Sequence, residues 1–136
     1  MIFIVSGEFI KIAHNNLAVL HLDGWGVTKS YKEARRLFGL ALAKGYGPAT
    51  QNLKVLDDLI RTECPLLGKR IIITGTSRED LNGKVGVATD FDHAKGRYVV
   101  AWGGRGNTSR VLKVLPENLE SEESARMVEE TLNDLD

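Results

Sequence analysis

The sequence is poor in cysteine and proline and has no long apolar run. Cys64 is the only cysteine among 136 residues, so an intrachain disulfide is excluded and a reducing compartment is favoured. No apolar run approaches the ~18 residues of a membrane-spanning helix. The apolar start, residues 1–5, is too short for a signal-peptide core and lacks a basic lead-in. These absences predict a soluble intracellular protein, in the cytoplasm or inside an organelle.

The sequence also lacks the motifs by which most enzymes are identified. It has no nucleotide-binding glycine pattern and no hydrolase motif. His14 and His21 lie seven residues apart on one predicted helix face and could share a metal ion. With no third ligand nearby, ordinary histidines on a helix face are the simpler interpretation. We therefore expect no catalytic residues, no metal and no cofactor.

The net charge of zero conceals a separation of acidic and basic residues. From residue 117 onward there are eight acids and one base, a net charge of −7, so residues 1–116 carry +7. Within that basic part, residues 66–116 carry +5. The acidic tail either docks on a basic surface, in cis or in trans, or only keeps a surface helix solvated. The sequence leaves both interpretations open.

The chain contains an internal repeat with an offset of 36 residues. Segment 13–20 aligns with segment 49–56, with Ala, Asn, Leu, Val and Leu at matching places. A period in this range is typical of stacked helical hairpins, in which each unit buries its apolar face against the next. Such units usually bind other molecules, so the repeat favours an interaction protein over an enzyme.

Residues before Pro65 follow a helical period. The pattern predicts helices over about 10–22, 31–44 and 49–62. Ser30 and Glu33 predict a capping box with two reciprocal hydrogen bonds, and Gly45 suits a left-handed C-cap. The expected buried stripes are Ile10, Ala13, Leu17 and Leu20 in the first helix, Ala34, Leu37, Phe38 and Ala41 in the second, and Ala49, Leu53, Leu56 and Ile60 in the third.

After Pro65 the period changes from helical to extended. Runs at 69–74, 85–91, 97–102 and 110–115, separated by glycine turns, predict four or five strands in a small barrel over 68–119. An amphipathic helix is expected over 121–135, packing its apolar stripe on the barrel, the repeat or a partner. That stripe comprises Ala125, Val128, Leu132 and Leu135. The predicted fold class is α+β, with domains 1–64 and 65–120 and a tail 121–136.

Residues 13–60 resemble a Sel-one-like repeat, a relative of the tetratricopeptide repeat. The matching residues lie in 16–27, 31–34 and 41–45 and at Ala49. His21 departs from the family, which usually has tyrosine there, and Gly39 interrupts a helix. The resemblance implies closely packed helical hairpins that bind peptides or protein surfaces. It covers about one and a third repeats, fewer than the ~3 that usually stand alone, so open ends need a neighbour.

Residues 66–120 resemble a Src-homology-3-like barrel. The matching residues are Leu67, Gly68, Leu81, Asn82, Gly83, Gly86, Gly96, Arg97, Tyr98, Val100, Pro116, Asn118 and Leu119. This resemblance implies a fold and says little about a ligand.

Two functions are compatible with these patterns. The preferred one is a non-catalytic protein–protein interaction adaptor, or a peripheral scaffold subunit of a larger complex. Trp25 is either an exposed interface anchor or a seal between helices and barrel. The alternative is nucleic-acid or modified-peptide binding by the basic barrel, in the manner of Tudor or KOW barrels. The candidate partner-binding residues are His14, Asn15, Ala18, His21, Trp25 and Arg105.

The aromatic residues of the barrel bear on that alternative. Tyr98 and Trp102 share one strand parity with Val100, which favours a place in the core over an aromatic cage. This pattern is the reason for preferring the adaptor.

Overall fold

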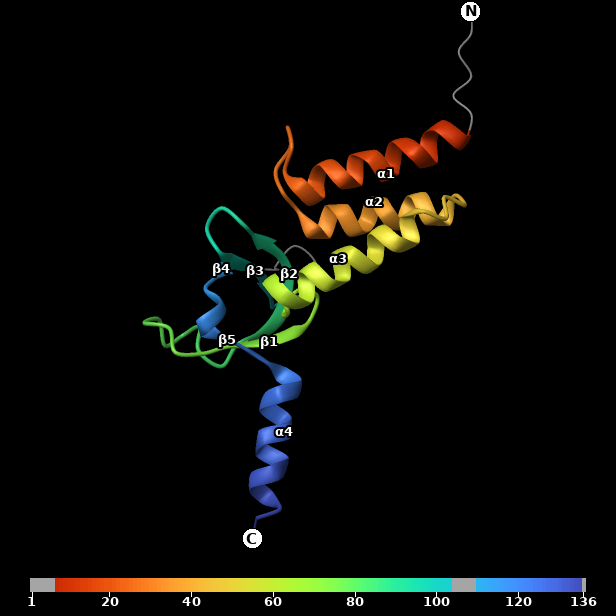
Figure 1. Ribbon diagram of the computed structural model, residues 1–136. Helices are drawn as coiled ribbons and strands as arrows, with labels where there is room; N and C mark the ends of the chain where they lie inside the picture. The colour runs from red at the N-terminus through yellow and green to blue at the C-terminus, as the bar shows by residue number, and fades with distance from the viewer. Residues whose placement is uncertain (1–6, 104–109, 136) are drawn as a thin grey trace, which may run out of the picture. The chain divides into compact units, whose positions relative to one another are not determined.

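The computed structural model describes residues 7–103 and 110–135 and has a mixed α+β architecture (Figure 1). The chain divides into two compact units, Met1–Pro65 and Leu66–Asp136. In its described residues, the first unit is helical and the second contains an antiparallel sheet followed by a helix. The α+β class expected from the change of period is therefore confirmed.

Three helices form the first unit: α1 (Gly7–Asp23), α2 (Tyr31–Ala43) and α3 (Ala49–Glu63). They run alongside one another in Figure 1 and match the three predicted helices to within a few residues. Small residues at the contacts let the helices approach closely. The buried core comprises Ala18, Tyr31, Ala34, Leu37, Phe38, Ala41, Ala49, Leu56, Ile60 and Cys64.

Half of the predicted capping box is present at the start of α2. The Ser30 hydroxyl accepts a hydrogen bond from the Glu33 amide at 3.1 Å. The reciprocal bond is absent, because the Ser30 amide already donates to the carbonyl of His21 at 3.0 Å. The Glu33 carboxylate instead pairs with Arg36, one helical turn away. The capping-box prediction was thus correct for the hydroxyl and wrong for the carboxylate.

Gly45 ends α2 as the sequence predicts. Its φ of 91° lies in the left-handed region. The Gly45 amide donates to the Leu42 carbonyl, and the Tyr46 amide donates to that of Ala41, both at 2.9 Å. This pair of bonds is a Schellman motif, which satisfies the last carbonyls of α2 and turns the chain into α3.

The predicted buried stripe is correct for α2 and α3 but wrong for α1. Leu17 and Leu20 are each 39% exposed, and Ala13 is also exposed. Ala18 faces inward instead, together with Asn15. The apolar stripe of α1 therefore lies on its outer face, while a smaller and more polar face contacts the neighbouring helices.

The second unit contains five short strands: β1 (Arg70–Ile73), β2 (Val85–Asp92), β3 (Arg97–Trp102), β4 (Arg110–Val114) and β5 (Leu119–Ser121). Their order in the sheet is β4-β3-β2-β1-β5, and every neighbouring pair is antiparallel. The sequence did not identify β5 as a strand, because it has only three residues and follows a 3₁₀ turn at Pro116–Asn118. It pairs with β1, where Leu119 lies opposite Ile73.

The core of the sheet follows the expected alternation. Tyr98 and Val100 are 2% and 0% exposed, whereas Trp102 at the end of the same strand is half-buried. The Tyr98 hydroxyl accepts a hydrogen bond from the Leu66 amide at 3.2 Å. The placement predicted for Tyr98 and Val100 is confirmed, but Trp102 keeps part of its ring accessible.

Helix α4 (Glu122–Asn133) follows β5 directly, close to the predicted range (Figure 1). The Ser121 hydroxyl caps it by accepting from the Ser124 amide at 2.9 Å. Arg70 on β1 pairs with Glu122 at 2.5 Å and ties the first turn of α4 to the sheet. Among the helices of residues 7–103 and 110–135, none has the length and apolarity needed to span a membrane.

Candidate partner-binding surfaces

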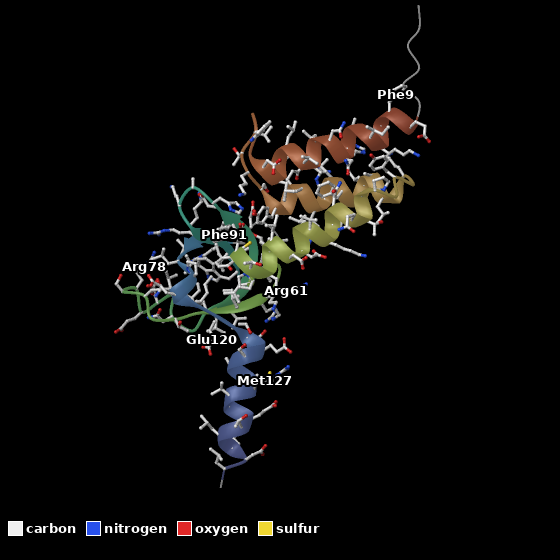
Figure 2. The ribbon with its side chains drawn as sticks, in the orientation of Figure 1. Phe9, Arg61, Arg78, Phe91, Glu120 and Met127 are labelled. Carbon is white, nitrogen blue, oxygen red and sulfur yellow. The ribbon has the colours of Figure 1, made fainter. Side chains whose placement is uncertain are left out.

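The first candidate surface is the outer face of α1, which we define by Phe9, Ile12, Leu17 and Leu20. Their exposed fractions are 67%, 37%, 39% and 39%. Phe9 and Leu20 lie about three turns apart on one side of the helix, and Ile12 and Leu17 lie on the two flanks of that side. Figure 2 shows Phe9 near the N-terminal end of α1. This face is an apolar strip along nearly the whole helix.

Trp25 lies on the turn after α1. It is 74% exposed and lies between Gly24 and Gly26, whose φ values are 72° and 71°. Its amide donates to the Leu20 carbonyl at 3.1 Å, which fixes the backbone beneath the indole. A Cβ added at Gly24 would lie 3.0 Å from the Lys29 Cβ, so the turn also needs glycine for space. Trp25 is therefore an exposed ring on a defined turn.

The histidines and their neighbours on α1 do not form an open groove. Ala18 is fully buried and Asn15 is 7% exposed, contrary to the expectation that both line a binding surface. The Asn15 Oδ1 accepts a hydrogen bond from Asn52 Nδ2 on α3 at 2.9 Å, so packing within the unit occupies this face. His14 is half-buried, and its Nδ1 has no hydrogen-bond partner among the residues described. The His21 Nδ1 lies 3.2 Å from the Thr28 carbonyl and donates to it.

The second candidate surface is a hollow of about 370 Å³ on the sheet unit. We call it the arginine-rimmed hollow. Its apolar lining includes Trp102 and Val111, which is 63% exposed, and two arginines complete it. Figure 2 places Arg78 on the long connection between β1 and β2. The lining residues are Arg78, Leu81, Trp102, Arg110, Val111 and Leu112. Arg105, predicted as a contact, lies outside the described residues.

The third candidate surface is the apolar seam of α4. Val128, Leu132 and Leu135 are 57%, 61% and 75% exposed, while Ala125 is half-buried near the sheet. Met127 beside them is 59% exposed and is labelled on α4 in Figure 2. The helix forms as predicted, but within the described chain its seam is left largely uncovered.

A cleft of about 640 Å³ lies between β1 and the first turns of α4. Arg70 and Glu122 pair within it, and this contact lowers the pKa of the carboxyl below its usual range. Its remaining charged residues are of both signs: Lys69, Arg126, Glu123 and Glu129. Because acidic and basic side chains are mixed, the cleft favours neither an anionic nor a cationic ligand.

Groups suited to chemistry do not gather in the part of the chain that the structure describes. No three His, Cys, Asp or Glu side chains there lie close enough together to hold a metal ion. Cys64 is fully buried and belongs to no disulfide in the described part of the chain. The largest pKa change belongs to Tyr31, whose burial and hydrogen bond to Glu63 both raise the pKa of the phenol. That pair joins α2 to α3 and has a structural role.

The sequence missed several residues of these surfaces. Phe9 and Ile12 were not recognised because the apolar stripe of α1 was expected to be buried. Arg78 and Arg110 lie more than thirty residues apart and meet only in the folded sheet unit. Searches among protein-family descriptions, curated proteins and solved structures found no match to this chain.

Proposed function

We propose that this protein is a non-catalytic protein–protein interaction adaptor, or a peripheral subunit of a larger complex, that binds through the outer face of α1 and Trp25. The observation that carries the proposal is the exposure of four large apolar side chains along one helix face. Exposed apolar patches of this kind mark contact sites. Trp25 is suited to anchor the contact, because exposed tryptophans that become buried dominate many interfaces.

The packing of α1 supports this role. Its inner face already contacts α2 and α3 through Ala18 and Asn15. The outer face of α1 is more apolar than this inner face, and an apolar helix face is normally buried against another element. We infer that a protein partner provides the second cover.

The two family resemblances are part of the same proposal. Three consecutive packed helices support a Sel-one-like repeat, and an antiparallel meander of five short strands supports a Src-homology-3-like barrel. Repeats of this kind bind peptides or protein surfaces, which agrees with an adaptor.

The partner can be identified by placing a photo-crosslinking residue at position 17 of the full chain. A second crosslinker at position 42 is the control, because Leu42 on α2 is 40% exposed, almost the same as Leu17. We expect one protein to be captured at physiological salt from position 17 and not from position 42. Equal capture from both positions would contradict a specific site on α1.

The affinity of the captured protein then tests Trp25. We expect Trp25→Ala to weaken binding by about 1–3 kcal/mol, the usual loss for an interface anchor, while the melting temperature stays unchanged. Leu42→Ala should leave the affinity unaltered. A lower melting temperature with unchanged affinity would instead assign Trp25 a role in sealing the fold.

A second candidate function is binding of nucleic acid or a modified peptide by the basic sheet unit. The half-buried Trp102 between Arg78 and Arg110 favours it, since stacking and basic side chains together bind single strands. Fluorescence anisotropy with a labelled oligonucleotide tests it. Binding that weakens steeply with added salt would support this function, and no binding at low salt would exclude it.

A further inference from the structure

We propose that α4 of one copy of this chain docks into the arginine-rimmed hollow of a second copy, so that the chains associate head to tail. The proposal concerns surfaces other than the outer face of α1 and does not depend on the function proposed above. It rests on the polarity and charge of two exposed features within one chain.

The docking element is the seam of α4. Ala125, Val128, Leu132 and Leu135 follow one another at spacings of three, four and three residues. That spacing places Ala125, Val128 and Leu132 on one side of α4, which is how an amphipathic helix enters an apolar groove, and Leu135 follows in the turn after Asn133. The exposed fraction rises along the seam, from a half-buried Ala125 to 75% at Leu135. The C-terminal part of the helix is therefore free to enter another surface.

The receiving element is the arginine-rimmed hollow. Leu81, Trp102, Val111 and Leu112 supply an apolar lining. Arg110 supplies positive charge, and Arg78 also lines the hollow while its guanidinium pairs with Asp80 at 2.9 Å. Four of six lining residues are apolar and only one is aromatic, which fits an amphipathic helix better than a run of stacked bases.

The net charges of the two regions indicate which molecule the hollow binds. Residues 122–135 contain five acids and one base, a net charge of −4, whereas residues 66–116 carry +5. Among these acids, Glu129 lies at the edge of the seam, whereas Glu130 lies on the opposite side of the helix. Opposite potentials of this kind select partners and set the register of a contact.

The anchoring of the first turn of α4 favours docking between copies over docking within one chain. The Arg70–Glu122 pair holds the first turn of α4 beside β1. A second copy can supply the helix without breaking that pair.

Pairing of two α4 helices with each other is less favourable. The seam, residues 125–135, is shorter than two heptads, whereas a coiled coil is usually sustained over ~3–4. Each helix would also bring a net charge of −4 to the same contact. Docking into the hollow removes both difficulties.

A head-to-tail contact uses different surfaces on the two copies. Such contacts continue until a ring closes or a filament grows. The full chain should therefore form species larger than a dimer as its concentration rises. Sedimentation velocity over a concentration series measures this, and raising the salt from about 0.05 M to about 0.5 M should weaken association by screening the charges.

Two variants test the two surfaces separately. Leu132→Asp places a charge in the seam, and the double variant Arg78→Glu, Arg110→Glu reverses the charge of the hollow. Each should lower the association constant at least about tenfold. The matched controls are Asn133→Asp, which adds a charge beside the seam, and Lys95→Glu, which reverses an exposed base in the β2–β3 turn. Both controls should associate like the unaltered chain.

Mixing the two disrupted variants gives the decisive measurement. The Leu132→Asp chain keeps its hollow and the double-arginine variant keeps its seam, so the mixture should form a one-to-one heterodimer and nothing larger. Pairing of α4 with α4 would leave the double-arginine variant associated on its own, and would overturn the proposal. A chain that stays monomeric at every concentration, or a hollow that takes only the oligonucleotide, would also overturn it.

Discussion

Asn15 shows how a single buried polar side chain can fix the inner face of a helix. Its amide oxygen is buried and accepts from Asn52 across the gap between α1 and α3. An apolar residue at either position would satisfy packing without specifying a register, whereas two amides must meet at one place. The pair therefore favours the observed rotation of α1.

Replacement of Asn52 tests this contact. Asn52→Ala leaves the buried Asn15 oxygen without its donor and should lower the free energy of unfolding by about 1–3 kcal/mol. Urea unfolding followed by circular dichroism measures the change. The control, Asn16→Ala, alters an exposed residue next to Asn15 on α1 and should change the free energy of unfolding by less than about 0.5 kcal/mol. Equal effects from both variants would contradict a structural role for the pair.

Gly86 and Gly39 predict opposite outcomes for the same substitution. A Cβ at Gly86 would lie 2.5 Å from the Ala101 carbonyl oxygen, so Gly86→Ala should destabilise the protein by about 1–3 kcal/mol. A Cβ at Gly39 meets nothing within 4 Å, and this glycine lies inside α2. Gly39→Ala should therefore stabilise the protein by up to about 1 kcal/mol. Thermal unfolding measures the melting temperature of each variant. Shifts of the same sign for Gly86→Ala and Gly39→Ala would contradict this expectation.

At the scale of elements, the contact between Tyr31 and Glu63 joins the start of α2 to the end of α3. The buried phenol donates to the carboxylate. Burial and then this hydrogen bond raise the pKa of Tyr31 above its usual value of about 10. The contact is therefore sensitive to alkaline pH.

The direction in which stability changes with pH follows from the raised pKa of Tyr31. The folded state holds the phenol proton more tightly than the unfolded chain, so the contribution of Tyr31 is complete below pH ~10 and declines as the pH rises above that value. Tyr31→Phe should lower stability by about 1 kcal/mol at neutral pH and reduce the alkaline decline. Urea midpoints at about pH 8 and about pH 11 measure both effects. An identical decline in the variant would assign the pH dependence to other groups.

Helix α1 shows why its buried face could not be predicted from the spacing of apolar residues. Apolar residues lie on its outer side, and the inner side holds Ala18 beside Asn15. Periodicity alone selects the more apolar side. Helices α2 and α3 have one apolar side each, so the same reasoning succeeded for them.

At the scale of the whole molecule, each of the two units has its own buried core. Val100→Ala should remove about 2 kcal/mol from the sheet unit and leave the helical unit unchanged, because domains with separate cores open separately. Amide hydrogen exchange resolved by residue measures this. Leu37→Ala, in the core of the helical unit, is the reciprocal variant. Equal loss of protection in both units after either substitution would contradict separate cores.

The sequence by itself determined the helices, most of the strands and the change of period near Pro65, because these depend on local spacing, caps and turn glycines. It also predicted the amphipathic character of α4. Only the tertiary structure decided which side of α1 is buried, that Ala18 and Asn15 are closed to a partner, and that Arg78 and Arg110 line one hollow. The physical reason is that burial and proximity depend on residues distant in the sequence, whose contacts no local period records.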